Sequence, residues 1–287
     1  MSSSNSSRSA LYSVCMYFIE NFKYILYFLY GSVCLLRKYS TDIRYSKSNS
    51  NSGIINVLGN GPSCHNTFNH NTCPNEKVMV VNFMAITDYF FEYKPEFYVL
   101  IDSDHLKDDS DKLLMLYEAL RKVDWSMILF VPVSFRKQAE SLVSNNNITI
   151  KFINFNYLPG KSKTVFSLYK KNIATPRFQN VVVACLYVSI NLGFKEIKLH
   201  GVESSEFQMF EINEHNEVLL NTEHSYGNAT RNLTKEGKIP KGEFWKYLRF
   251  YIFMLEGYSQ VKSYSDFVGC NIVNYTKKSF IDSFDKK

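Results

Sequence analysis

The sequence predicts an α/β domain in which helices cover both faces of a mostly parallel β-sheet. From residue 54 onward, short apolar runs that end in polar residues alternate with longer segments of helical periodicity. Strands that alternate with helices in this way pair in parallel and are buried on both faces. The chain has 287 residues, of which 45% are hydrophobic, so it is large enough to bury the core that such a sheet needs.

Strands are expected where short apolar runs are bounded by turn residues or end in polar residues. The run Ile54–Leu58, for example, lies between Gly53 and Gly59. The expected strands are 54–58, 78–81, 97–101, 127–131, 148–155, 196–199 and 261–264.

Helices are expected where apolar residues recur every three or four positions. Leu113, Leu116 and Leu120 show this spacing. The segment 179–192 is strongly apolar and is followed by Gly193, and glycine commonly follows the last residue of a helix. The expected helices are 108–122, 134–144, 179–192 and 244–255.

Residues 1–52 are expected to lie outside the folded domain, which spans 53–287. After a serine-rich start, residues 10–36 carry two apolar runs, and a polar linker leads to the domain. A helix needs about 20 mostly apolar residues to cross a bilayer, and neither run is that long. Arg37 and Lys38 follow the second run, which suits an anionic membrane face. We therefore expect a cytoplasmic protein associated with the inner face of the cytoplasmic membrane, with the apolar segment spanning it, lying on it or capping the domain.

The composition excludes some classes of function. The net charge of +6 suits anionic substrates or lipids but falls short of a nucleic-acid-binding surface, and no motif interleaves aromatic and basic residues for that purpose. The six cysteines are scattered through a chain that is too large to need disulfides, which fits a reducing compartment. The composition is also compatible with a homo-oligomer.

The most informative segment is Gly59-Asn60-Gly61-Pro62-Ser63, which follows the first expected strand. Glycine at both positions keeps side chains away from the backbone and permits positive φ values that aim successive N–H groups inward. Nucleotides and phosphates bind at such turns. Other strands also end in polar residues, at Asn82, Asp102–Asp104 and Gly201–Ser205. Because ligands of parallel sheets bind beyond the carboxyl ends of the strands, we expect these four endings to share one crevice.

Several segments together resemble the bacterial sialyltransferases of glycosyltransferase family 42 and the related sialyltransferase-like proteins of surface-polysaccharide loci. The resemblance covers roughly residues 54–284 and depends on the order and spacing of its parts. The segments that carry it are Gly59–Ser63, Val81–Phe83, Pro95–Asp102, Arg177 with the following helix, Leu192–Glu203, Glu223–Tyr226 and Asn274–Phe284.

The resemblance implies a single Rossmann-like domain, a variant of the GT-A fold, with a lid around residues 205–242 and no metal or other cofactor. The implied donor substrate is a CMP-activated sugar. The implied reaction is the inverting transfer of a keto sugar acid to a hydroxyl of a surface glycan or glycolipid, such as a lipooligosaccharide. Such a transfer requires a pocket for cytidine, groups that stabilise the departing phosphate, and a base that removes the acceptor proton.

Three residues are assigned catalytic roles from this resemblance. His224 matches the catalytic histidine of the family, and an imidazole with an ordinary pKa of about 6.5 accepts a hydroxyl proton at neutral pH. Arg177 matches an arginine near the active site. Tyr226 and Lys198 are candidates to stabilise the departing phosphate. In this respect the chain departs from the family, which has tyrosines where this chain has Lys198 and Glu203.

The donor is expected to bind through polar side chains and through the N–H groups of a helix N-terminus. Asn60 and Ser63 match nucleotide-binding positions, and Asn82 matches an asparagine that contacts the nucleotide or its sugar. Asn180 lies where a helix dipole favours a phosphate or a carboxylate. The other candidates for donor binding are Gly59, Gly61, Asp102, Ser103, Lys198, Gly201, Glu203 and Ser279.

Two other functions stay open. Asp102-Ser103-Asp104 matches the Asp-x-Asp pattern that binds a divalent ion in many transferases of nucleoside-diphosphate sugars, because hard oxygen ligands at this spacing can clamp a metal between phosphate oxygens. The sequence is also compatible with a nucleotide-binding protein of the same fold that has no transferase activity.

Overall fold

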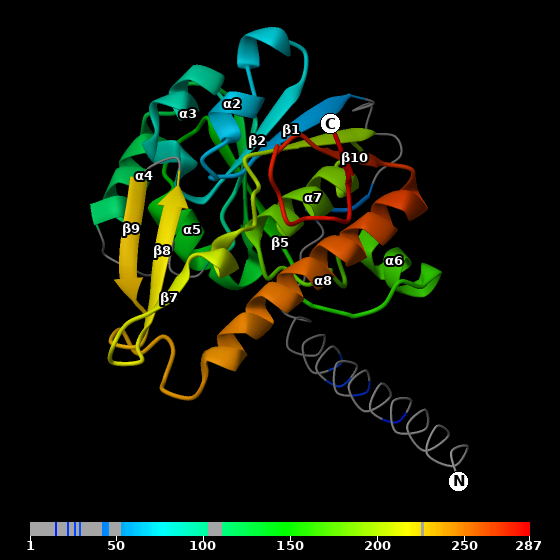
Figure 1. The fold of residues 1–287 in the computed structure, drawn as a ribbon. Helices are drawn as coiled ribbons and strands as arrows, with labels where there is room; N and C mark the ends of the chain where they lie inside the picture. Colours follow the sequence, from blue (N-terminus) through cyan, green and yellow to red (C-terminus); the bar gives the residue numbers. More distant parts are fainter. Residues whose placement is uncertain are drawn as a thin grey trace.

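An eight-stranded sheet lies at the centre of the molecule (Figure 1). The computed structural model describes residues 42–45, 53–102, 111–224 and 227–287, together with the single positions 15, 22, 26 and 29, and it describes no side chains within 222–229. All neighbouring strands of this sheet are parallel, which confirms the predicted α/β class with a mostly parallel, Rossmann-like sheet. In their order across the sheet, the strands are β11 (Asp285–Lys286), β10 (Asn271–Asn274), β6 (Glu196–His200), β1 (Ile54–Leu58), β2 (Lys77–Val81), β3 (Phe97–Val99), β4 (Met127–Pro132) and β5 (Ile148–Ile153).

Helices cover both faces of this sheet, as predicted. Successive strand residues point to opposite faces, so Met79 and Val81 of β2 pack on one side, and Val78 and Val80 pack on the other. The first side is covered by α6 (Lys163–Lys170), α7 (Val181–Asn191) and α8 (Phe244–Val268), and the second by α2 (Cys64–Thr67), α3 (Asp88–Tyr93), α4 (Asp111–Arg121) and α5 (Arg136–Leu142). Short 3-10 helices lie at His70–Thr72, Asn82–Ile86, Val133–Phe135 and Glu206–Gln208.

Helix α7 corresponds to the predicted helix 179–192. It is apolar on all sides, and its residues from Val182 to Asn191 are buried between the sheet and α8, where such a helix belongs. The helix begins after Asn180, whose side-chain oxygen accepts a hydrogen bond from the Val182 N–H at 2.7 Å. This cap fixes the point at which the chain enters the helix.

The order of the strands changes direction beside β1. Strands β1 to β5 follow one another outward on one side, whereas β6, β10 and β11 lie on the other side of β1. The chain segments that leave β1 and β6 therefore diverge. In doubly wound sheets, ligands bind outside the carboxyl ends of the strands at such a reversal.

A smaller antiparallel sheet occupies much of the region 205–242, where the sequence predicts a lid. It consists of β7 (Phe210–Ile212), β8 (Val218–His224) and β9 (Gly227–Asn232). The residues of β9 are mostly polar, and they form a strand because their backbone groups pair with those of β8. Backbone pairing does not require alternating apolar residues, so the local sequence does not indicate this strand. The small core of this sheet consists of Val218, Leu220, Leu233 and Ile239.

The predicted strand 261–264 is wrong, because these residues belong to α8. The helix that was expected to end at residue 255 continues to Val268. Gly257 interrupts the apolar pattern, but a Cβ atom at this position would lie 2.5 Å from the carbonyl oxygen of Arg177. The glycine therefore allows α8 to pack closely on the segment before α7 and does not end the helix.

Part of the expected linker packs on the domain. Ile43 is buried in the core, and the Asp42 side chain accepts a hydrogen bond from the Phe152 N–H at 3.1 Å. The predicted membrane-associated segment, residues 10–36, lies outside the described residues apart from the four single positions. In the part of the chain that the structure describes, no helix combines the length and the apolar character needed to cross a membrane.

A buried polar network joins β1 to β6 and to the start of β2. The Asn56 side chain donates to Glu76 at 2.8 Å, and its oxygen accepts from Nε2 of His200 at 3.1 Å. Glu76 also forms an ion pair with Lys198 at 2.6 Å. Lys198, a candidate for phosphate binding, is therefore held in this network by a carboxylate. Burial lowers the pKa of His200 to about 4, so its ring is neutral near pH 7.

We expect His200 to make the fold sensitive to mild acid. Its pKa is about 4 in the folded protein and about 6.5 in the unfolded chain, so the unfolded state binds the proton more readily. The free energy of unfolding should be highest above about pH 6.5 and fall by about 2–3 kcal/mol as the pH approaches 4. The variant His200→Gln, which keeps a donor for Asn56, should lack this part of the loss. Urea unfolding at neutral pH and at about pH 4.5 measures the difference, and equal losses in both proteins would contradict the expectation.

Candidate functional site

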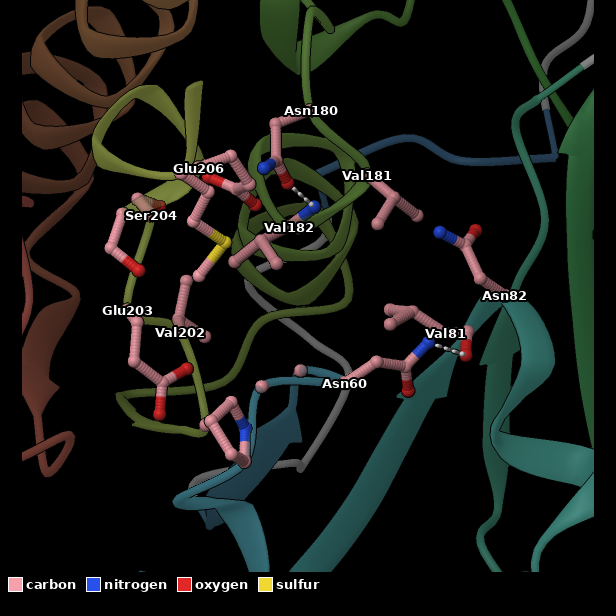
Figure 2. A pocket seen from close by; sticks show the side chains of 16 residues that line it. Asn60, Val81, Asn82, Asn180, Val181, Val182, Val202, Glu203, Ser204 and Glu206 are labelled. Carbon is pink, nitrogen blue, oxygen red and sulfur yellow. Dashed lines mark hydrogen bonds between the residues drawn. The ribbon is translucent and has the colours of Figure 1, made fainter. Parts of the chain in front are cut away.

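A cavity of about 130 Å³ lies where the turns after β1, β2 and β6 meet the N-terminus of α7 (Figure 2). We call it the turn cavity. It lies at the reversal of strand order, where ligands of doubly wound sheets bind. Three of the four polar strand endings contribute to it, whereas Asp102 does not. The turn cavity is lined by residues 59–62, 81–82, 180–182, 201–206 and Met209.

The two glycines after β1 have a different role from the one predicted. The N–H of Gly59 donates to the carbonyl oxygen of His200 at 2.8 Å, and the N–H of Gly61 donates to that of Gly201 at 2.9 Å. These N–H groups therefore bond to the turn after β6 and are not aimed at a ligand. A Cβ atom on Gly59 would lie 2.4 Å from the carbonyl oxygen of Gly201. Glycine is required here because it lets the two turns touch.

Two asparagine side chains line the turn cavity with oxygens that have no partner among the described residues. Asn60 donates to the carbonyl oxygen of Val81 at 3.3 Å, while its own side-chain oxygen is buried without a partner among the described residues. Asn82 has a φ of 47°, which is rare outside glycine, and the Tyr98 hydroxyl donates to its backbone oxygen. Its side-chain oxygen is also buried and has no partner in the described part of the chain. A ligand with N–H or O–H groups would satisfy both amides.

Two acidic side chains line the turn cavity from the segment after β6 (Figure 2). Oε1 of Glu203 accepts a hydrogen bond from the Ser63 N–H at 3.0 Å. Oε2 of Glu206 is buried and has no partner among the described residues. Burial, with a further contribution from the charge of Glu203, raises the pKa of Glu206. The N-terminus of α7 on the other side of the cavity supplies a positive dipole potential.

Arg177 lies outside the turn cavity. Its guanidinium forms an ion pair with Glu256 of α8, with an Nε–Oε2 distance of 3.1 Å. It also lies over the rings of Tyr157 and Phe253, at 4.2 and 4.0 Å from their centroids. The charge of Arg177 therefore holds α8 against the segment before α7.

A second cavity, of about 430 Å³, adjoins the turn cavity. We call it the aromatic cavity. The rings of Phe155 and Phe178 meet edge to face, with 4.9 Å between their centroids. Asp102 lies in its wall, and Asn82, Asn180 and Val181 line both cavities. The aromatic cavity is lined by Asn82, Ile101, Asp102, Phe135, Phe155, Phe178, Gln179, Asn180 and Val181.

Several other predicted site residues hold the backbone in place. Ser63 lies outside the turn cavity, and its carbonyl oxygen accepts bonds from the first turn of α2. The Ser279 hydroxyl donates to the carbonyl oxygen of Val202 at 2.7 Å, which ties the C-terminal segment to the turn after β6. Gly201 has a φ of 62° at the bend of that turn.

Three predicted residues cannot be placed in either cavity. His224 ends β8 opposite Gly227, and its side chain is outside the described part of the structure. Tyr226 and Ser103 lie outside the described residues altogether.

Sequence reasoning missed Glu206 and the aromatic cavity. Glu206 follows the predicted ending Gly201–Ser205 by a single residue, so a slightly longer reading of that polar segment would have included it. Phe155 and Phe178 come from segments far apart in the sequence, and no local pattern indicates that they meet.

No family model matches the chain, and no curated protein matches its sequence. Solved structures with a similar arrangement include the sialyltransferase CstII from Campylobacter jejuni in complex with the substrate analogue CMP-3FNeuAc, at 15% identity and a TM-score of 0.43 over 82% of this chain and 85% of that one. The α-2,3-sialyltransferase Cst-I from the same organism shows 14% identity and a TM-score of 0.45, over 82% and 80% of the two chains. The MAf glycosyltransferase from Magnetospirillum magneticum AMB-1 shows 13% identity and a TM-score of 0.47, over 87% of this chain but 36% of that protein. At these values, conclusions about function depend on the site itself.

Replacing Gly59 should separate the two turns. In Gly59→Ala, the new Cβ atom would lie 2.4 Å from a backbone oxygen that cannot easily move. We expect a loss of about 1–3 kcal/mol in the free energy of unfolding, as is usual for overpacking. Gly53→Ala is the matched control, because nothing lies within 4 Å of a Cβ atom there, and it should change stability by no more than about 0.5 kcal/mol. Urea unfolding compares the two variants, and a neutral Gly59→Ala would show that the turns need not touch.

Proposed function

We propose that this chain is an inverting glycosyltransferase of the sialyltransferase type, which takes a keto sugar acid from a CMP-activated donor and transfers it to a hydroxyl of a surface glycan or glycolipid. The observation that carries the proposal is the composition of the turn cavity. The sequence assigns Asn60, Asn82, Asn180, Gly201 and Glu203 to donor binding from four separate stretches, and all of them line this cavity. Their meeting point is the position at which doubly wound sheets bind nucleotides.

In this proposal the donor occupies both cavities, with a different part of the molecule in each. The nucleoside occupies the turn cavity, where the unpartnered oxygens of Asn60 and Asn82 accept hydrogen bonds from ribose hydroxyls or the cytosine amine. The sugar occupies the aromatic cavity, whose rings cover its apolar faces. The phosphate lies between them at the N-terminus of α7, where the helix dipole favours a negative charge.

The charge of the site favours a monophosphate-linked donor. At the phosphate position, the diester that links CMP to a sugar carries one negative charge, whereas the linkage of a nucleoside-diphosphate sugar carries two. The carboxylate of a keto sugar acid belongs to the sugar, which this proposal places in the aromatic cavity. Each additional charge would be repelled by Glu203 in the wall of the turn cavity. The alternative that uses Asp102 and Asp104 requires a divalent ion to offset these charges.

In this proposal His224 is the base that removes the proton from the acceptor hydroxyl. As the acceptor oxygen attacks the anomeric carbon, the bond from that carbon to the phosphate oxygen breaks, and the base takes the proton. Because His224 ends β8, this proposal assigns the base to the small antiparallel sheet. The proposal therefore gives that sheet a catalytic role in addition to the covering role of a lid.

Attachment of residues 10–36 to the inner face of the cytoplasmic membrane, and assembly into a homo-oligomer, stay predictions from the sequence. Attachment would place the two cavities close to a lipid-linked acceptor.

A ligand panel tests the proposed donor. CMP without metal should raise the unfolding temperature, because a ligand at a hundred times its Kd adds about 2.7 kcal/mol to the free energy of unfolding. CDP, UDP and NAD should raise it less. A thermal-shift measurement with each nucleotide, in the presence of either manganese or a chelator, separates the possibilities. A preference for UDP with manganese would favour the metal-dependent alternative and overturn the CMP proposal.

Removing the proposed base should affect transfer but not binding. His224→Ala should lower the rate of sugar transfer by about 10²- to 10⁴-fold, the usual contribution of a general base. Its affinity for CMP should stay unchanged. His215→Ala is the matched control, because His215 is an exposed residue between β7 and β8. Full transfer activity in His224→Ala would remove this residue from the mechanism, and nucleotide binding with no transfer by the unmodified protein would indicate a non-catalytic binding protein.

A further inference from the structure

We propose that Glu206 enters the turn cavity as a neutral carboxylic acid and donates a hydrogen bond to the phosphate of the bound nucleotide. This inference rests on the proposed function and adds a residue to it. Glu206 lines the cavity from the 3-10 helix that follows β6 (Figure 2). Its Oε2 atom is buried and has no partner among the described residues. A proton on such a buried oxygen removes the cost of a buried charge and lets the group donate a hydrogen bond to an anion in the cavity.

The second carboxyl group of the cavity explains why Glu206 is the protonated one. Oε1 of Glu203 accepts a hydrogen bond from the Ser63 N–H at 3.0 Å. Two carboxylates in one cavity repel each other, which favours a proton on one of them. Burial and the charge of Glu203 raise the pKa of Glu206 accordingly.

The described groups that surround Glu206 do not offset a negative charge on it. Glu203 faces it from its own segment, and Tyr247, Tyr251 and Tyr258 face it from α8. Burial raises the pKa of each of these tyrosines, so they remain neutral phenols. Arg231 of β9 faces Tyr247 and is ion-paired with Glu236 at 2.5 Å.

The two basic residues that the sequence assigns to the site are also paired with acids. Lys198 of β6 is bound to Glu76 at 2.6 Å, and Arg177 is bound to Glu256 at 3.1 Å. In this proposal a phosphate in the turn cavity is therefore stabilised by the α7 dipole and by a carboxylic acid, and not by a lysine or an arginine. A protonated carboxyl is a hydrogen-bond donor of this kind.

The proton on Glu206 also has a place in the transfer step. When the bond between the anomeric carbon and the phosphate oxygen breaks, its electron pair stays on that oxygen. The proton of Glu206 passes to the phosphate, and the proton of the acceptor hydroxyl passes to the base. Glu206 is left as a carboxylate beside Glu203, which favours release of CMP and return of a proton from solvent.

The pH dependence of ligand binding tests this assignment. The ligand is the methyl ester of cytidine 5′-monophosphate, which carries one negative charge from pH 5 to pH 8 and resembles the donor linkage. For the unmodified protein, Kd should rise about tenfold for each pH unit above the pKa of Glu206. In Glu206→Gln the amide donates at every pH, so Kd should lose this dependence and be lower than that of the unmodified protein at pH 8. Glu211→Gln, at an exposed position on β7, is the control and should follow the unmodified protein.

The outcomes separate the two proposals. If Glu206→Gln keeps the pH profile of the unmodified protein, or if the unmodified protein binds the ester with no pH dependence, the role of Glu206 is overturned while the nucleotide site stands. If neither the unmodified protein nor Glu211→Gln binds the ester or transfers sugar at any pH, the proposed function itself is overturned. Urea unfolding of each variant at the same pH values confirms that folded proteins are being compared.

Discussion

The contact between the turn after β1 and the turn after β6 is the constraint on which the site depends. Gly59 and Gly61 donate to the backbone of the facing turn at 2.8 and 2.9 Å, and neither position leaves room for a Cβ atom. This contact sets the spacing of the two strand ends at the point where the strand order reverses. It also places Glu203 against Gly61, where its carboxylate holds the Ser63 N–H. The shape and the charge of the turn cavity both follow from it.

The charge of the whole chain says little about the charge of this site. The protein carries a net charge of +6, yet the turn cavity is walled by Glu203 and Glu206. Lys198 and Arg177, the two basic residues that the sequence assigns to the site, are held by Glu76 and by Glu256. Each of these pairs joins two elements of the fold. The same basic residues that suggest anion binding in the sequence thus stabilise the packing around the site.

The sequence predicted β1 to β6 of the parallel sheet because each of them is a short apolar run bounded by turn or polar residues, a local property, whereas β10 and β11 were not predicted. It also indicated the place of the turn cavity, because the polar residues at the ends of β1, β2 and β6 can each be recognised from the local sequence alone. What could not be predicted depends on partners distant in the chain. Gly59 and Gly61 were assigned to ligand contact because their facing turn is about 140 residues away. The close packing of α8 at Gly257 is not evident from the local sequence either, because the backbone it contacts, at Arg177, lies far away in the chain. Charges such as Lys198 seemed available because Glu76 lies 122 residues before it.

The two cavities share Asn82, Asn180 and Val181, and this shared wall makes their occupants thermodynamically dependent on each other. Whatever fills the aromatic cavity contacts the same residues that a ligand in the turn cavity contacts. By linkage, each ligand then changes the affinity for the other by the same factor. The backbone of Asn82 is held at a φ of 47° by the turn itself and by the Tyr98 hydroxyl, so this shared wall has little freedom to adapt to one occupant alone.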